Sequence, residues 1–222
     1  MNRIAFATLI FIMMLLPTYS AHADIGTRLS SEGIAPFPFT AEEIEILSAF
    51  GIDSNAHALA FNAPAGTHAI HIYVYKNEKQ AEWLLYESGS IVDFSDEPLD
   101  GLFTMIVNQD SSIELRLSSI SGMSFTSAPI ENYGMVKASS EEFLQDYHTI
   151  ELEKEIPVAM MVYDRNYDDG APVGEYSLDD YYNPERFDVV DTVRVVTLMF
   201  SALTDENGGA SVSTEEQASQ QH

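Results

Sequence analysis

The chain has 222 residues, of which 10 are Lys or Arg and 35 are Asp or Glu, and it contains no cysteine. The net charge of −25 repels nucleic-acid phosphates and anionic lipid surfaces, so neither kind of partner is expected. Without cysteine, a disulfide framework and a thiol nucleophile are both excluded. The length is sufficient for one domain with a substantial hydrophobic core.

The N-terminus has the pattern of a secretory signal peptide. Arg3 supplies a positive charge, residues 4–16 carry no charged side chain, and residues 21–23 (Ala-His-Ala) form a small-x-small cleavage motif. The apolar stretch is shorter than the about 20 residues that span a bilayer, which disfavours an uncut anchor. We therefore expect cleavage before Asp24 and a mature protein in the periplasm or outside the cell, with no membrane insertion. Export without disulfide bonds is typical of bacteria.

A short helix is predicted after a lead-in segment, residues 24–39, that has no periodicity. Thr40 and Glu43 form a capping box, and Gly51 is placed to end the helix. Apolar residues recur at helical spacing between them, at Ile44, Leu47 and Phe50. We expect this helix at the edge or end of a sheet.

The rest of the chain has mostly the period of two that is typical of strands. The expected strands cover residues 57–61, 69–76, 80–87, 101–108, 112–118, 123–127, 147–153, 157–163 and 189–200. Residues 112–118 alternate strictly between apolar and polar side chains, which predicts one buried and one wet face. Residues 157–163 are almost continuously apolar and predict a central strand. Residues 69–76 and 80–87 predict a hairpin, although a helix is a close rival for the second.

Three further segments have their own character. A second helical turn is predicted near Ser139, with Glu141 and Glu142 in its first turn. Residues 164–188 are acidic and aromatic. Residues 204–222 contain almost nothing to bury, which predicts a disordered acidic and polar tail.

The number and spacing of the strands predict a mainly β fold. Strands do not alternate with long helices, which disfavours parallel α/β architectures. We expect a single domain over residues 40–203, built as an antiparallel two-sheet sandwich or jelly roll with one or two short peripheral helices.

One acidic segment resembles a calcium-binding loop in its residue types. Asp164, Asn166 and Asp168 stand at alternate positions, and Glu175 follows at the twelfth. Calcium takes six to eight oxygen ligands, and such a loop can supply several of them. The glycine stands one place late and a strand precedes the loop, so an acidic surface turn is the competing interpretation. The surface turn is the favoured interpretation, so no cofactor is expected, and calcium is the alternative.

Aromatic side chains mark a second candidate site. His71, Tyr73 and Tyr75 share one face of a predicted strand, and Trp83 lies in the neighbouring segment. An exposed aromatic stripe can stack on sugar rings or anchor a protein interface. The alternative is that the stripe belongs to the hydrophobic core. Tyr73, Tyr75 and Trp83 are the predicted binding residues.

No catalytic residue can be assigned from the sequence. The common motifs of exported serine hydrolases do not occur, and His68 and His71 would point to opposite faces of a strand, which disfavours a shared zinc ion. The leading hypothesis is an exported, non-catalytic module that binds a protein or a glycan. The alternatives are a hydrolase that uses two carboxylates on glycans and a structural or regulatory envelope protein.

Overall fold

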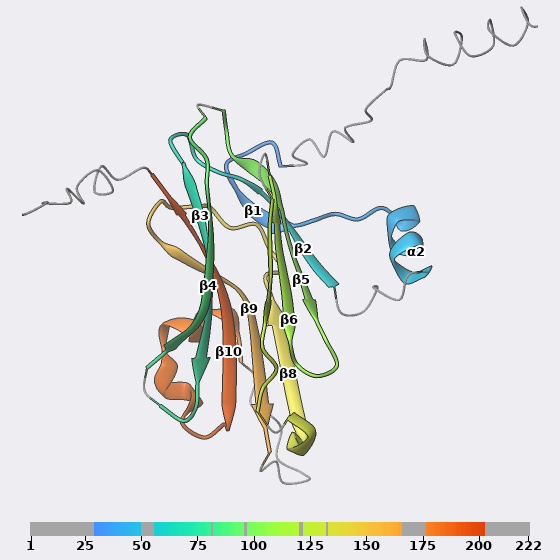
Figure 1. Cartoon of the computed structure of the whole chain (residues 1–222), viewed down its shortest axis with the longest axis vertical. Coiled ribbons are helices and arrows are strands. Elements are labelled where there is room, and N and C mark those ends of the chain that lie inside the picture. Colours follow the sequence, from blue (N-terminus) through green and yellow to red (C-terminus); the bar gives the residue numbers. More distant parts are fainter. Residues whose placement is uncertain are drawn as a thin grey trace, which may run out of the picture.

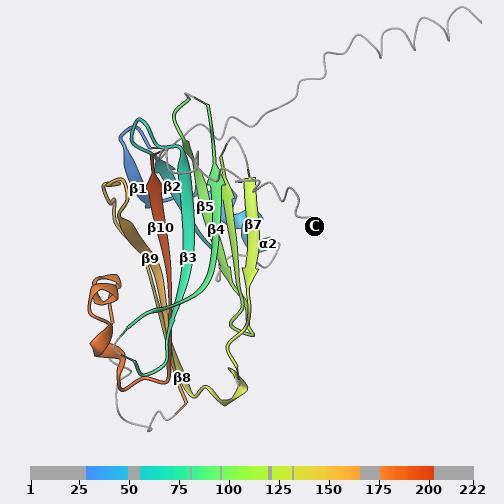
Figure 2. The ribbon, with the colours of Figure 1, turned by 60° about the vertical axis from the view of Figure 1, so that its left-hand side comes forward.

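The computed structural model of the chain describes residues 29–49, 56–80, 82–95, 97–119, 122–131, 133–165 and 176–202. In these residues, two antiparallel five-stranded sheets lie face to face (Figures 1 and 2). The predicted mainly β, two-sheet antiparallel fold is therefore confirmed. The expected signal peptide and tail lie outside the described residues.

Each sheet mixes strands from distant parts of the chain. Sheet A has the order β1 (Gly33–Pro36), β2 (Ala56–Asn62), β5 (Asp100–Val107), β6 (Ile113–Ser118) and β7 (Gly122–Ser127). Sheet B has the order β4 (Leu84–Val92), β3 (Ala69–Asn77), β10 (Thr192–Ser201), β9 (Glu155–Asp164) and β8 (Ala138–Phe143). The lead-in segment thus contributes β1, which pairs with β2.

The main hydrophobic core lies between the sheets. Ile70, Ile72 and Val74 point into it from β3, and all three are fully buried. Phe61 and Phe103 meet them from sheet A. Ile70, Ile72 and Val74 alternate with His71, Tyr73 and Tyr75, so the aromatic stripe lies on the face of β3 that is turned away from this core.

A second apolar cluster covers part of the outer face of sheet B. Its strand residues are Met160 and Val162 of β9 and Val193 and Val195 of β10. Two 3₁₀ helices, η2 (Leu178–Tyr182) and η3 (Pro184–Phe187), pack over them, with Phe187 fully buried. Figure 2 shows this orange segment on the side of β9 and β10 that is turned away from β7. Two buried faces explain why β9 and β10 are almost continuously apolar.

The predicted helix is present as α2 (Ala41–Ala49). Its capping box forms as expected: the Thr40 N–H donates to Glu43 Oε2 at 2.6 Å, and the Glu43 N–H donates to Thr40 Oγ1 at 3.3 Å. Figure 1 shows α2 standing apart from both sheets. Ile44 and Ile46 are accordingly 51% and 57% exposed. Among the described residues, no helix is long and apolar enough to cross a membrane.

Two local predictions are wrong. The helical turn expected near Ser139 is strand β8, because pairing with β9 supplies a hydrogen-bond ladder that outweighs local helix propensity. The strand expected over residues 147–153 is irregular, and only His148 forms a bridge, with Ile34. The residues there alternate in polarity, but the segment has no partner strand, and without one it cannot form the ladder of backbone hydrogen bonds that makes a strand. A further 3₁₀ helix, η1 (Tyr133–Met135), precedes β8.

Candidate functional site

The outer face of sheet B is covered by η2 and η3 over one half. The other half, which we call open, is partly exposed at His71, Tyr73 and Met199, although Thr197 and Pro157 within it are buried. Antiparallel partners that stand directly opposite point to the same face. Across β3, β10 and β9, the open half has two such rows: His71, Met199 and Glu155, and then Tyr73, Thr197 and Pro157. The covered half begins with the row of Tyr75, Val195 and Met160. The second apolar cluster therefore ends where the open half begins.

A β-bulge places Glu155 on this outer face. The register of β9 against β10 shifts between Val196 and Thr197, so that Val196 pairs with Ala159 while Thr197 pairs with Pro157. Because faces alternate along a strand, residues 155 and 160 would point to opposite sides without the extra residue. Pro157 lacks a backbone N–H and is tolerated at such an irregularity. The bulge thus brings the Glu155 carboxylate to the same face as Met160.

Three hydroxyl groups donate hydrogen bonds to the Glu155 carboxylate. The Tyr75 hydroxyl donates to Oε1 at 2.8 Å, and the hydroxyls of Tyr181 and Thr197 donate to Oε2 at 2.8 and 2.7 Å. The Tyr182 hydroxyl donates to the backbone carbonyl of Glu155 at 3.2 Å. Glu155 therefore joins β3, β9, β10 and η2 at one point.

The two tyrosines that donate to Glu155 remain protonated. Burial raises the pKa of Tyr75 and of Tyr181 above the ordinary value, and the hydrogen bond to Glu155 raises both further. Both hydroxyls are thus fixed donors at neutral pH. Together they hold the carboxylate in a single orientation.

The aromatic rings form a continuous row along the same face. Ring centroids are 6.0 Å apart between His71 and Tyr73, between Tyr73 and Tyr75, and between Tyr75 and Tyr181. His71 and Tyr73 are nearly parallel, with 9° between their planes. We call His71, Tyr73, Tyr75, Tyr181, Tyr182 and Glu155 the tyrosine face.

Trp83 supports this face from its covered end. Its indole N–H donates to the Tyr181 carbonyl at 2.8 Å, and its ring lies 5.7 Å from Tyr181 and 5.5 Å from Phe187. Asn77 holds the turn that leads to Trp83, because its side-chain amide donates to the Gln80 carbonyl at 2.6 Å. Trp83 therefore anchors η2 to the hairpin of β3 and β4.

That hairpin is the predicted one, with one change. Its second strand begins at Leu84 rather than at residue 80. The segment is a strand, so the rival helical interpretation is wrong. The segment is a strand because it pairs with β3 along its length. This pairing satisfies backbone N–H and C=O groups, some of which would lack hydrogen-bond partners in a short isolated helix.

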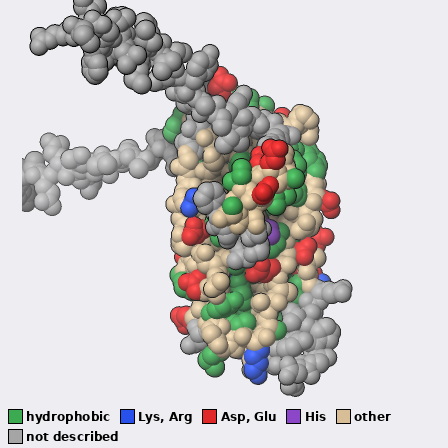
Figure 3. Space-filling model, turned by 90° about the vertical axis from the view of Figure 1, so that its right-hand side faces the viewer, with side chains coloured by type: hydrophobic (Ala, Val, Ile, Leu, Met, Phe, Trp, Pro, Cys, Tyr) green, Lys and Arg blue, Asp and Glu red, His purple; other side chains and the backbone are tan. Residues whose placement is uncertain are grey.

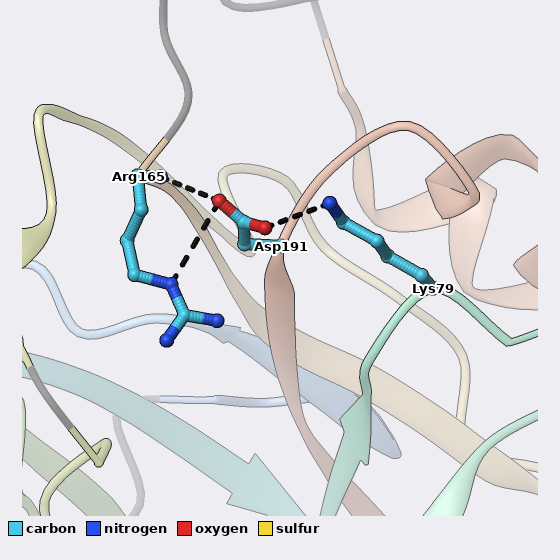
Figure 4. A network of polar contacts seen from close by, with 3 residues as sticks. All are labelled: Lys79, Arg165 and Asp191. Atoms are coloured by element: carbon cyan, nitrogen blue, oxygen red, sulfur yellow. Dashed lines mark hydrogen bonds and ion pairs between the residues drawn. The ribbon is translucent and has the colours of Figure 1, made fainter.

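An ion-pair network ties the base of the covered half together (Figure 4). Asp191, which precedes β10, lies 2.8 Å from Lys79 Nζ and accepts the Arg165 backbone N–H at 2.7 Å. Burial would raise the pKa of Asp191, but the contacts with Lys79 and the Arg165 N–H outweigh it and lower the pKa to about 2. The network joins the β3–β4 turn to the end of β9.

The two predicted sites differ in what the structure describes. Tyr73, Tyr75 and Trp83 all belong to or support the tyrosine face, and whether they bind a partner stays a prediction. Of the calcium loop, Asp164 lies at the end of β9, while Asn166, Asp168 and Glu175 lie outside the described residues. Within the described residues, no group of three or more His, Asp or Glu side chains is placed to hold a metal.

Sequence reasoning missed Glu155, Thr197 and Tyr181 as members of the site. Thr197 and Glu155 interrupt or border apolar runs, which is the one signal that could have indicated them. Tyr181 was noted only as one of several aromatic residues in the acidic segment. Nothing local links these three residues, because register and a bulge bring them together.

Acidic side chains also occur on the side of the molecule that carries α2. Figure 3 views the side on which α2 lies, where acidic side chains are scattered and basic ones lie at the margins. The comparisons with known proteins add no relationship: no family model, curated protein or solved structure matches the chain.

Proposed function

We propose that this protein is an exported, non-catalytic binding module that recognises its partner with the tyrosine face. The observation that supports the proposal is the ordered row of aromatic rings around Glu155, where His71, Tyr73 and Tyr75 remain partly exposed beside η2. Large aromatic rings that remain partly exposed are enriched where proteins bind partners. Fixed hydroxyls and a fixed carboxylate reduce the entropy lost on binding.

Two kinds of partner fit such a face. A second protein would bury the aromatic rings. A glycan would stack its sugar rings on them, and its hydroxyl groups would donate hydrogen bonds to Glu155. The row of centroids at 6.0 Å spacing suits an extended ligand of either kind.

The hydrolase alternative has less support. Three hydroxyl donors surround the Glu155 carboxylate, which leaves it an acceptor rather than a proton donor. Burial raises the pKa of Glu141, as a general acid would need, but Glu141 pairs with Met161 of the inner core. Glu141 therefore lies on the opposite face of the sheet from Glu155.

The test of the binding proposal is capture of a partner by mature protein that starts at Asp24. We expect a component of the source organism's envelope or medium, or a sugar on a glycan array, to be retained. The combined substitution Tyr73→Ser and Tyr75→Ser should abolish retention. The control, Ile46→Ser with Phe94→Ser, removes two side chains that are 57% and 79% exposed elsewhere and should leave retention unchanged. Equal retention by the tyrosine variant would refute the proposal.

Export has its own test. N-terminal sequencing of the protein from the envelope and medium should find Asp24 as the first residue. An intact Met1 on protein recovered there would contradict cleavage, and recovery only from the cytoplasm would contradict export.

A further inference from the structure

Two carboxylates, those of Glu155 and Glu153, place negative charge at the tyrosine face. Glu155 lies at its centre. Burial raises the pKa of Tyr73, and the negative charges of Glu155 and of exposed Glu153 raise it further. Among the described residues, neither Glu153 nor Glu155 forms an ion pair with a Lys, Arg or His. The face therefore combines uncompensated negative charge with aromatic rings.

Among the described residues, one acceptor position of the Glu155 carboxylate receives no donor. An ionised carboxylate offers about four acceptor positions, two on each oxygen. The hydroxyls of Tyr181 and Thr197 take both positions on Oε2, whereas Tyr75 takes only one on Oε1. The vacant position belongs to the oxygen that lies beside the Tyr75 ring.

The rings around this carboxylate can also hold a cation. A guanidinium or ammonium group within about 6 Å of an aromatic centroid is attracted by the negative face of the ring. Tyr73 is partly exposed, and its hydroxyl has no hydrogen-bond partner among the described residues. The Tyr73 ring is thus positioned by its contacts with the rings of His71 and Tyr75 rather than by a hydrogen bond of its hydroxyl group.

Among the residues that the structure describes, few positive charges compete for this place. Lys154 Nζ contacts Glu151 at 3.2 Å, and its charge opposes the burial that raises the pKa of Tyr182. Burial lowers the pKa of His71, with the charge of Glu153 acting in the opposite sense, so the imidazole is neutral at neutral pH. A basic partner is also favoured by the net charge of −25.

We infer that the tyrosine face binds a basic side chain of a partner polypeptide, seated on Tyr73 and Tyr75 and hydrogen-bonded to Glu155 Oε1. Arginine suits the place best, because its planar guanidinium stacks on aromatic rings while donating to a carboxylate. This inference rests on the proposed function and specifies its partner as a protein segment rather than a glycan.

The experiment is a calorimetric titration of the mature protein with a hexa-arginine peptide. Salt of about 0.15 M screens charges more than about 8 Å apart, which suppresses general attraction to the acidic surface. We expect Tyr73→Leu and Glu153→Gln each to weaken the affinity about three- to tenfold, as the loss of one cation–π or charge contact would. Both residues are at the surface, so the fold should survive, as a thermal melt would verify.

Two matched controls separate the site from the general charge. Glu114→Gln removes the same charge from the outer face of sheet A, and Phe94→Leu removes an exposed ring elsewhere. Both should leave the affinity unchanged within about twofold. Absence of binding, or equal weakening by Glu114→Gln and Glu153→Gln, would overturn the inference.

The outcome can be told apart from failure of the binding proposal. A captured partner that needs Tyr73 and Tyr75 but is a glycan, or is not displaced by hexa-arginine, would refute the basic side chain and leave the binding module intact. Hexa-arginine displacing a captured partner from the wild type would support both. A partner that binds equally well after the substitution of Tyr73 and Tyr75 would refute the proposal that the tyrosine face is a binding site.

Discussion

The outer faces of the two sheets are built differently. Across four strands of sheet A, one outer row consists of Ala58, Thr104, Arg116 and Ser124. The corresponding face of sheet B carries valines and one methionine under η2 and η3, and then the tyrosine face. This row of sheet A has small and polar side chains that need no cover, whereas the apolar row of sheet B needs a second layer.

The residue pattern of a strand depends on whether one or both of its faces are buried. β6 alternates because only one of its faces is buried, with Leu115 fully buried and Arg116 exposed. β10 has no such alternation because the 3₁₀ segment buries its second face as well. The tyrosine face lies at the border of these two conditions, where aromatic residues with polar ends are partly buried.

The largest expected effect tests whether the second layer is a true core. Phe187→Ala should lower the free energy of unfolding by about 3–5 kcal/mol, because the ring is fully buried and a cavity would remain. Urea unfolding followed by the fluorescence of Trp83, the single tryptophan, would measure it. Phe94→Ala, at a site that is 79% exposed, should change the value by less than about 0.5 kcal/mol. Similar small changes in both variants would mean that the layer is not packed.

A smaller effect concerns the network that holds the second layer at its base. Asp191→Asn should cost about 1–2 kcal/mol near neutral pH, since Lys79 is 46% exposed and solvent screens its charge. The pKa of Asp191 is lowered from 3.8 to about 2 on folding, so its contribution is complete above pH 3.8 and disappears as the pH falls towards 2.

The pH dependence gives this prediction its control. The difference in stability between wild type and Asp191→Asn should shrink from pH 5 to pH 2, as the carboxylate of Asp191 is protonated. A difference that stays constant over this range would show that the charge of Asp191 is not what stabilises the fold.

The tyrosine face offers a matched pair of variants that differ by one hydrogen bond. Tyr75→Phe removes a donor to Glu155 and should cost about 1 kcal/mol. Tyr73→Phe removes a hydroxyl without a partner among the described residues and should cost less than about 0.5 kcal/mol. Thermal melts of both variants would show the difference. Equal costs would place the two hydroxyls in equivalent surroundings, contrary to the structure.

The smallest effect is expected on sheet A. Arg116→Ala should change the free energy of unfolding by less than about 0.5 kcal/mol, because its contact with Glu114 at 3.3 Å is exposed. Chemical unfolding is again the measurement. A cost above about 1 kcal/mol would mean that this face is covered and that the contrast between the sheets is wrong.

The character of several strands and the capping of α2 can be predicted from the amino-acid sequence alone. Strict alternation in residues 112–118 identified a half-buried strand, and the apolar run of residues 157–163 identified a strand buried on both faces. Thr40 and Glu43 identified the start of the helix. These features depend on near neighbours along the chain, so the chain order alone contains them.

Which side chains come into contact depends on the tertiary structure. The bulge at Pro157 moves Glu155 to the outer face, and η2 brings Tyr181 to it from a distant segment. Pairing with β9 made a strand of the segment at Ser139. Arg194, in an apolar strand, is fully buried between the sheets, where it donates to the Ser111 carbonyl at 3.1 Å. Each outcome depends on register between strands far apart in the chain, which no local pattern contains.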